Sequence, residues 1–168
     1  MAATSPSPDP WSPPTAQQRL AMLREARTIA IVGASPNPNR SSFFVATYLR
    51  AESSYRLFFV NPVVDEILGE PTYPSLAALP ETPDVVDVFR RAEDLGAVTD
   101  EAIERGSRVL WFQLGLSDLS CAARAAEDGI SVVMDRCLKI EHARFKGGLH
   151  LAGFDTGVIS SRRRPLLT

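Results

Sequence analysis

The fold is decided by the stretch Thr28-Ile29-Ala30-Ile31-Val32-Gly33-Ala34-Ser35-Pro36-Asn37-Pro38-Asn39-Arg40-Ser41-Ser42-Phe43-Phe44. Its apolar run is too short for a helix and breaks at a glycine, which predicts a buried strand over 28–33. A loop of prolines and asparagines follows, and two serines precede a new apolar periodicity, which predicts a helix over 41–52. The free N–H groups and the dipole at such a helix start favour an anion.

The same alternation continues along the chain. Further strands are predicted over 56–60, 85–89, 108–112 and 130–134, and further helices over 16–27, 92–105 and 118–127. Residues 63–83 hold four prolines and read as a loop, with a short strand at 66–68 and a helical turn at 75–79. Such β-α-β units predict an α/β fold, a Rossmann-like three-layer α/β/α sandwich around a parallel sheet of five strands or slightly more.

Length and proline content suggest the domain organisation. The 168 residues suit a single domain, since a domain takes about 100 to 200 residues. Residues 1–14 contain five of the thirteen prolines and are expected to be a disordered tail. Residues 15–145 form the predicted domain, and 146–168 a C-terminal extension that packs on it or trails from it. Apolar residues near 145–159 are compatible with a homodimer.

Composition excludes several classes of partner. A net charge of −2 and a pI near 5.7 argue against a nucleic-acid binder, which usually carries a strongly basic surface. The apolar runs are all shorter than the ~18 residues of a membrane span, and the first residues do not resemble a secretory signal. Cys121 and Cys137 make no disulfide framework. The sequence therefore predicts a cytoplasmic protein without membrane or nucleic-acid partners.

The candidate site lies where the parallel strands end, because α/β sheets bind ligands beyond their carboxyl ends. Arg40, at the predicted helix start, adds a full positive charge and a fork of donors suited to phosphate oxygens. Arg90 and Arg91 follow the third main strand and add positive charge at the same edge. This constellation indicates a ligand with several phosphates.

Two common phosphate motifs are missing from the first loop. A P-loop needs a second glycine followed by lysine, and neither is present. The dinucleotide fingerprint needs three glycines, where this chain has Gly33, Ser35 and Pro38, and an acidic residue after the second strand, where it has Asn61. ATP hydrolysis is therefore unsupported, and an NAD(P)-dependent oxidoreductase is kept as an alternative.

Several segments in fixed order carry a family resemblance. They are Ile31-Val32-Gly33-Ala34-Ser35-Pro36, Val60-Asn61-Pro62, Ile67-Leu68-Gly69, Tyr73-Pro74-Ser75-Leu76, Val86-Asp87-Val88-Phe89-Arg90-Arg91, Trp111-Phe112-Gln113-Leu114-Gly115 and Met134-Asp135-Arg136-Cys137-Leu138-Lys139-Ile140-Glu141. From about Ile29 to Glu141 the chain resembles the small single-domain Rossmann-fold CoA-binding proteins, relatives of the CoA-binding domain of the succinyl-CoA synthetase alpha subunit.

The resemblance implies a binding mode for coenzyme A or an acyl-CoA. The first loop and helix start would take the pyrophosphate, Asn61-Pro62 and the Phe89-Arg90 turn would enclose the adenosine part, and Gln113 would lie along the pantetheine. The synthetases also carry a phosphorylated histidine in a second domain, which this chain lacks, so a non-catalytic protein is expected. The predicted cofactor-binding residues are Gly33, Ala34, Ser35, Asn37, Arg40, Ser41, Ser42, Asn61, Pro62, Phe89, Arg90, Arg91, Gln113 and Cys137.

Cys137 raises a second possibility. It follows the fifth main strand, and its neighbours Arg136 and Lys139 are expected to lower the pKa of the thiol toward the reactive thiolate. One hypothesis is a mixed disulfide with the coenzyme's thiol, which would make the protein a redox guard. The blander interpretation is a partly buried structural residue. His142, beside Glu141, is interpreted as a structural hydrogen bonder, and a scaffold with a degenerate pocket is a third reading of the chain.

Overall fold

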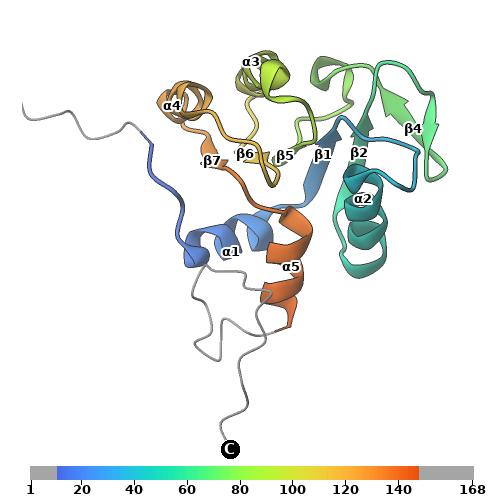
Figure 1. The fold of residues 1–168 in the computed structure, drawn as a ribbon, viewed down its shortest axis with the longest axis horizontal. Helices are drawn as coiled ribbons and strands as arrows, with labels where there is room; N and C mark the ends of the chain where they lie inside the picture. Colours follow the sequence, from blue (N-terminus) through green and yellow to red (C-terminus); the bar gives the residue numbers. More distant parts are fainter. Residues whose placement is uncertain (1–10, 148–168) are drawn as a thin grey trace, which may run out of the picture.

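The computed structural model describes residues 11–147, which form a sheet covered by helices on both faces (Figure 1). Within this range the strands are β1 (Thr28–Val32), β2 (Arg56–Val60), β3 (Glu66–Ile67), β4 (Glu70–Tyr73), β5 (Val85–Val88), β6 (Val109–Phe112) and β7 (Ser131–Val133). The helices are α1 (Ala16–Glu25), α2 (Ser41–Glu52), α3 (Leu95–Arg105), α4 (Leu119–Glu127) and α5 (Leu138–Lys146), with 3-10 turns η1 (Leu76–Ala78) and η2 (Ala92–Asp94). The predicted Rossmann-like α/β/α sandwich is confirmed.

The sheet order explains where a ligand can enter. The order is β3-β4-β2-β1-β5-β6-β7, and every pairing is parallel except that of β3 with β4. From β1 the chain winds outward through β2 and then returns to place β5 on the other side of β1. The topological switch point therefore lies between the carboxyl ends of β1 and β5, the place where open α/β sheets bind ligands.

Alternating side chains divide the core into two halves. On β1, Ala30 and Val32 belong to the half under α3 and α4, while Ile29 and Ile31 belong to the half under α1, α2 and α5. Figure 1 shows the two groups of helices on opposite sides of the strands. A strand buried on both faces is apolar along most of its length, which explains the apolar run 29–32 that marks β1 in the sequence.

Helix ends largely follow the local sequence signals. Thr15 and Gln18 form a reciprocal capping box at α1. Gly106 ends α3 in the left-handed conformation, as predicted for a helix C-terminus. The Asp118 side chain caps α4 by accepting from the N–H of Cys121.

Three elements differ from the prediction. The segment read as a loop contains β4, which pairs with β2 despite Pro71, because this strand lies near the sheet edge beside only the two-residue β3. The predicted helix over 92–105 starts as η2 and becomes α-helical only at Leu95. α5 was not predicted at all, since its charged sequence has no clear apolar period.

Parts of both ends of the chain lie outside the described residues. Residues 1–10 of the expected tail lie outside the described residues, but the Trp11 indole donates to the Val132 carbonyl at 2.9 Å. Most of the expected C-terminal extension, 148–168, also lies outside them, as does most of the stretch suggested for a dimer contact. None of the helices within residues 11–147 is long and apolar enough to cross a membrane.

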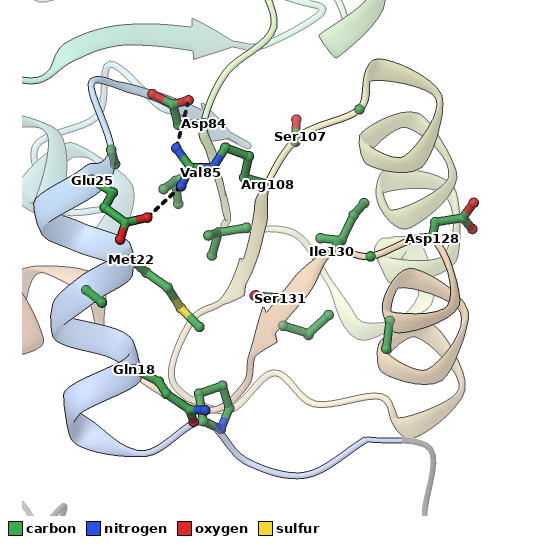
Figure 2. Close-up of a pocket in the computed structure, with 18 of the residues that line it drawn as sticks. Gln18, Met22, Glu25, Asp84, Val85, Ser107, Arg108, Asp128, Ile130 and Ser131 are labelled. Carbon is green, nitrogen blue, oxygen red and sulfur yellow. Dashed lines mark hydrogen bonds and ion pairs between the residues drawn. The ribbon is translucent and has the colours of Figure 1, made fainter.

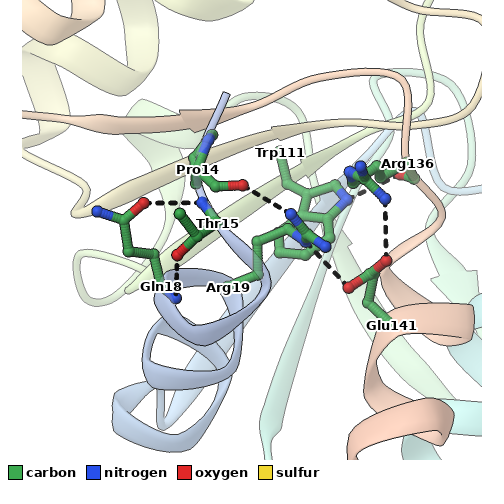
Figure 3. A network of polar contacts seen from close by, with 7 residues as sticks. All are labelled: Pro14, Thr15, Gln18, Arg19, Trp111, Arg136 and Glu141. Carbon is green, nitrogen blue, oxygen red and sulfur yellow. Dashed lines mark hydrogen bonds and ion pairs between the residues drawn. The ribbon is translucent and has the colours of Figure 1, made fainter. Parts of the chain in front are cut away.

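A buried ion pair joins α1 to α5. Figure 3 shows Arg19 and Arg136 converging on the Glu141 carboxylate, with Nε of Arg19 at 3.0 Å and Nη1 of Arg136 at 3.3 Å. The Trp111 indole donates to the carbonyl of Arg136 at 2.8 Å. These bonds hold the turn before α5, and with it Cys137, against the end of β6. On α1, Arg19 is buried whereas Arg24 is exposed.

Candidate functional site

The chain just after β1 passes very close to the chain just after β5 at Gly33. This residue has a φ of 81°, and a Cβ added to it would lie 2.3 Å from the carbonyl oxygen of Phe89. The same Cβ would lie 3.0 Å from Cδ of Arg90, so the Arg90 stem passes over the glycine. Only glycine fits at this crossing. Because Gly33 has no side chain, the first loop and the Phe89-Arg90 turn can lie against each other at the switch point.

The first loop is held by its own side chains. The Ser35 hydroxyl accepts from the N–H of Asn37, and the Asn37 side chain accepts from the N–H of Asn39. The Asn37 carbonyl accepts from the N–H of Arg40, which leads into α2. Asn37 therefore shapes the loop from within and does not line the cavity described below.

The start of α2 has no side-chain cap. Its N-cap residue is Arg40, a cation that makes no capping hydrogen bond, in contrast to the capped starts of α1 and α4. The first N–H groups of a helix need an acceptor from outside the helix, and the positive end of the dipole favours an anionic one. An uncapped start beside an exposed arginine therefore suits a phosphate.

Asn61 ties the second strand to the first loop. Its Nδ2 donates to the Ala34 carbonyl at 2.8 Å, and its Oδ1 accepts from the N–H groups of Val63 and Val64. The side chain thus lines the cavity while its oxygen serves the local turn. A carboxylate could not donate to Ala34, which gives a structural reason for an amide at this position.

Arg90 and Arg91 are adjacent in the chain but differ in position and in their ion pairs. Arg90 lines the cavity and, among the described residues, makes only a long ion pair, 3.6 Å, with Asp94. Arg91 lies outside the cavity, is 76% exposed, and pairs with Glu93 at 2.8 Å and Asp94 at 3.4 Å. The sequence could not separate them, because the distinction depends on how the turn after β5 leaves the sheet.

Together these segments enclose a cavity of about 500 Å³, here called the switch-point cavity. Two of its lining residues are arginines, and none of those described is Asp or Glu, so its charge favours anions. The predicted residues Asn37, Pro62 and Arg91 do not line it, whereas Val45, Leu114 and Leu116 do and were missed. The lining is Gly33, Ala34, Ser35, Arg40, Ser41, Ser42, Val45, Asn61, Phe89, Arg90, Gln113, Leu114, Leu116 and Cys137.

Gln113 at the end of β6 is backed by a buried acid. Its Nε2 donates to Oδ1 of Asp87 at 2.5 Å, and Asp87 on β5 is fully buried. Burial raises the pKa of Asp87 to about 7, although the hydrogen bond from Gln113 acts in the opposite direction. In the sequence, Asp87 is marked only by being a single acid inside an apolar strand, and no role was predicted for it.

Cys137 lies in the switch-point cavity, but its chemistry differs from the expectation. Burial raises the pKa of the thiol, so the predicted net lowering is wrong. The Lys139 charge does lower this pKa, but burial outweighs it, and Arg136 contacts Glu141 instead. Cys137 is also the N-cap residue of α5, so a second helix start faces the cavity.

His142 has a structural environment, as interpreted from the sequence. Its Nδ1 lies 3.0 Å from the Tyr48 hydroxyl, and its ring packs edge-on against Tyr48 and Tyr55. Burial lowers the pKa of this histidine. The residue does not line the switch-point cavity.

A larger cavity of about 740 Å³ lies at the opposite edge of the sheet, beside the amino ends of β5, β6 and β7. Figure 2 shows α1 on one side of it and Ile130 on the other. Its rim carries Glu25, Asp84 and Asp128, and its Arg108 already pairs with Glu25 at 2.7 Å. Despite its size, this cavity would repel phosphates, so the switch-point cavity is the better candidate for an anion.

The fold and this site define a class: a Rossmann-like protein with an arginine-lined cavity at the switch point of its sheet. Residues 27–143 match the family described as the CoA binding domain, and the chain belongs to that family. Membership supports coenzyme A binding in general, and a relationship to the CoA-binding domains of synthetases is consistent with it.

Individual relatives agree with this assignment. The uncharacterized protein YneT of Bacillus subtilis (strain 168) is 37% identical over 122 residues, which cover 73% of this chain and 90% of YneT. A hypothetical protein from Pyrococcus horikoshii OT3 has a TM-score of 0.77 at 34% identity, covering 82% of this chain and 98% of that one. A dinucleotide-forming acetyl-coenzyme A synthetase from Ca. Korarchaeum cryptofilum shares the fold, with a TM-score of 0.59 at 24% identity over 67% of this chain and 26% of its own.

Proposed function

We propose that this protein binds coenzyme A or an acyl-CoA in the switch-point cavity and acts as a binding module without turnover. The phosphates lie at the first loop and the start of α2, from Gly33 to Ser42. The adenosine part lies beside Asn61 and the Phe89-Arg90 turn, and the pantetheine arm runs along Gln113. The family supports the ligand class, and the geometry of the cavity supports this placement.

One observation carries the proposal. The uncapped start of α2, with Arg40 as its N-cap, faces the same cavity as Arg90, and no carboxylate is among the described residues of its lining. Charge-assisted bonds from arginine to phosphate are about twice as strong as neutral hydrogen bonds. Two such residues and a helix start can hold the several phosphates of coenzyme A on a protein whose net charge is negative.

The test is isothermal titration calorimetry with coenzyme A. Arg40→Ala and Arg90→Ala should each weaken binding by about 1 to 3 kcal/mol, because each removes a charged partner of phosphate. Arg91→Ala is the matched control: it removes an equal charge from the adjacent position but leaves the cavity intact, and should change affinity little. Absence of coenzyme A binding to the parent protein, or equal losses in all three variants, would refute the proposal.

Two other readings are resolved by parallel titrations. Saturable fluorescence enhancement of NADH would favour the oxidoreductase alternative. If neither coenzyme A nor NADH shifts the melting temperature, the cavity is a degenerate scaffold. If the proposal is right, coenzyme A raises the melting temperature and NADH does not.

The redox-guard hypothesis retains one supporting observation, since the Cys137 thiol lines the cavity proposed for the coenzyme. Its reaction would be attack of the Cys137 thiolate on a coenzyme A disulfide, releasing the other half as a thiolate. Intact-mass analysis after incubation with that disulfide tests it. An adduct on the parent protein that is lost in Cys137→Ser supports the hypothesis, and no adduct on the parent refutes it.

A further inference from the structure

A buried pair lies directly behind the switch-point cavity. Gln113 lines the cavity and is 6% exposed, while Asp87 is fully buried and does not reach the lining. The two are joined by the 2.5 Å bond from Gln113 Nε2 to Asp87 Oδ1. Within residues 11–147, Asp87 Oδ2 has no hydrogen-bond partner.

The chemistry of this pair fixes the direction of the Gln113 amide. An ionised carboxylate can only accept hydrogen bonds, so Gln113 must turn its nitrogen toward Asp87. The carbonyl oxygen Oε1 is the end left over, and among the described residues it receives no hydrogen bond. Oε1 of Gln113 is therefore available to accept a hydrogen bond from a ligand.

The position of Asp87 is costly for folding. It is flanked on β5 by Val86 and Val88, both fully buried, and a further apolar side chain would avoid the penalty of an acid with one unpaired oxygen. The Asp87 charge also acts on the Cys137 thiol, another lining residue, so the acid is close to two groups of the site. A costly buried group connected to a site in this way indicates a functional role.

We propose that Asp87 is a positioning residue that orients Gln113 so that its Oε1 accepts a hydrogen bond from an N–H group of the ligand. This inference rests on the proposed binding of coenzyme A, in which an amide N–H of the pantetheine arm is the donor. Asp87 therefore contributes to the selection of a ligand with such an arm over a nucleotide without one.

The test compares two ligands by calorimetry at pH 8. Coenzyme A carries the arm, and adenosine 3′,5′-bisphosphate does not. Asp87→Asn is nearly isosteric but can accept or donate, so it no longer dictates the direction of the Gln113 amide. It should bind coenzyme A roughly five- to tenfold more weakly, the value of one hydrogen bond, and the bisphosphate unchanged. Asp100→Asn, a surface change on α3, controls for the substitution itself.

A double-mutant cycle separates positioning from general damage to the fold. Gln113→Met removes the amide at similar size and should give the same selective loss. In that background Asp87→Asn should cause no additional loss, because its effect is transmitted through Gln113. Equal loss of both ligands in Asp87→Asn, no loss of either, or full additivity with Gln113→Met would overturn this inference while leaving the proposed function intact. A parent protein that binds no coenzyme A would overturn both.

Discussion

The backbone of Gly33 lies so close to Phe89 that a Cβ on the glycine would come within 2.3 Å of the Phe89 carbonyl oxygen. The contact joins the ends of the two strands between which the chain changes its direction of winding. The loop expected to cradle phosphates and the turn that carries Arg90 are placed by this one crossing.

Gly33→Ala should therefore lower the free energy of unfolding by about 2 to 5 kcal/mol, since it adds a backbone collision to the strain of a positive φ. Gly69→Ala is the matched control, because Gly69 has a φ of 78° with nothing within 4 Å of its added Cβ. It should lose only about 1 to 2 kcal/mol. Urea denaturation of both variants measures the difference, and equal losses would show that the collision is relieved cheaply.

The buried ion pair between Arg19 and Glu141 should contribute strongly to the stability of the fold. Both side chains are 3% exposed or less. Glu141→Ala should cost about 3 to 5 kcal/mol of unfolding free energy, because it leaves the buried Arg19 charge without its carboxylate partner. Glu81→Ala, which breaks the exposed pair with Arg56, should cost at most about 1 kcal/mol.

A second variant identifies the cause of that loss. Replacing both partners, with Arg19→Met and Glu141→Leu, removes the uncompensated charge and should recover most of the stability. If the single change costs no more than Glu81→Ala in urea denaturation, the pair does not fasten α5 to α1.

Asp87 predicts a specific pH dependence of stability. Its pKa is about 7 in the folded protein and 3.8 as the ordinary value, so the folded state takes up a proton first as pH falls. The stability from this group is fully present below the ordinary pKa and is lost as pH rises through 7. Between pH 8 and pH 6 it should add about 1.4 kcal/mol.

The Asp87→Asn variant isolates this effect from other titrating groups, including His142, whose lowered pKa acts in the opposite direction. The unfolding free energy of the parent minus that of the variant, measured by urea denaturation at each pH, should increase by about 1.4 kcal/mol from pH 8 to pH 6. A difference that stays constant would mean that Asp87 remains ionised in the folded protein throughout this range.

Cys137 is expected to be a slow nucleophile near neutrality. Burial raises the pKa of its thiol, which lowers the thiolate fraction at pH 7. Iodoacetamide should alkylate it more slowly than glutathione at pH 7, with a rate that rises as pH increases, as followed by intact mass. Cys137→Ser identifies the reacting residue, since Cys121 is buried. Alkylation faster than glutathione would restore the argument for an activated thiol.

Asp87 also affects this rate. Its charge contributes to the raised pKa of Cys137, so Asp87→Asn should accelerate the alkylation at pH 8. An unchanged rate would show that the two groups do not interact there.

Periodicity in the sequence determined much of the fold. β1, β5 and β6 are buried along their whole length and β2 over its second half, so each shows as a short, mostly apolar stretch, and Gly106 marks the end of α3 directly. β4 and α5 left no such trace. β4 is stabilised by pairing with β2, and α5 by packing Leu138 and Phe145 into the core and by the ion pair of Glu141 with Arg19, which lies 122 positions away in the chain.

Most of the residues that line the switch-point cavity could also be predicted from the sequence, because residues that follow parallel strands share one edge of the sheet. The sequence could not tell Arg90 from Arg91, exclude Asn37, or find the Asp87 pair behind Gln113. These distinctions depend on side-chain direction and burial, which arise only when distant segments pack together. The local pattern of residues 28–44 determined what kind of fold this is, and tertiary packing decided which of its charged and polar groups face the cavity.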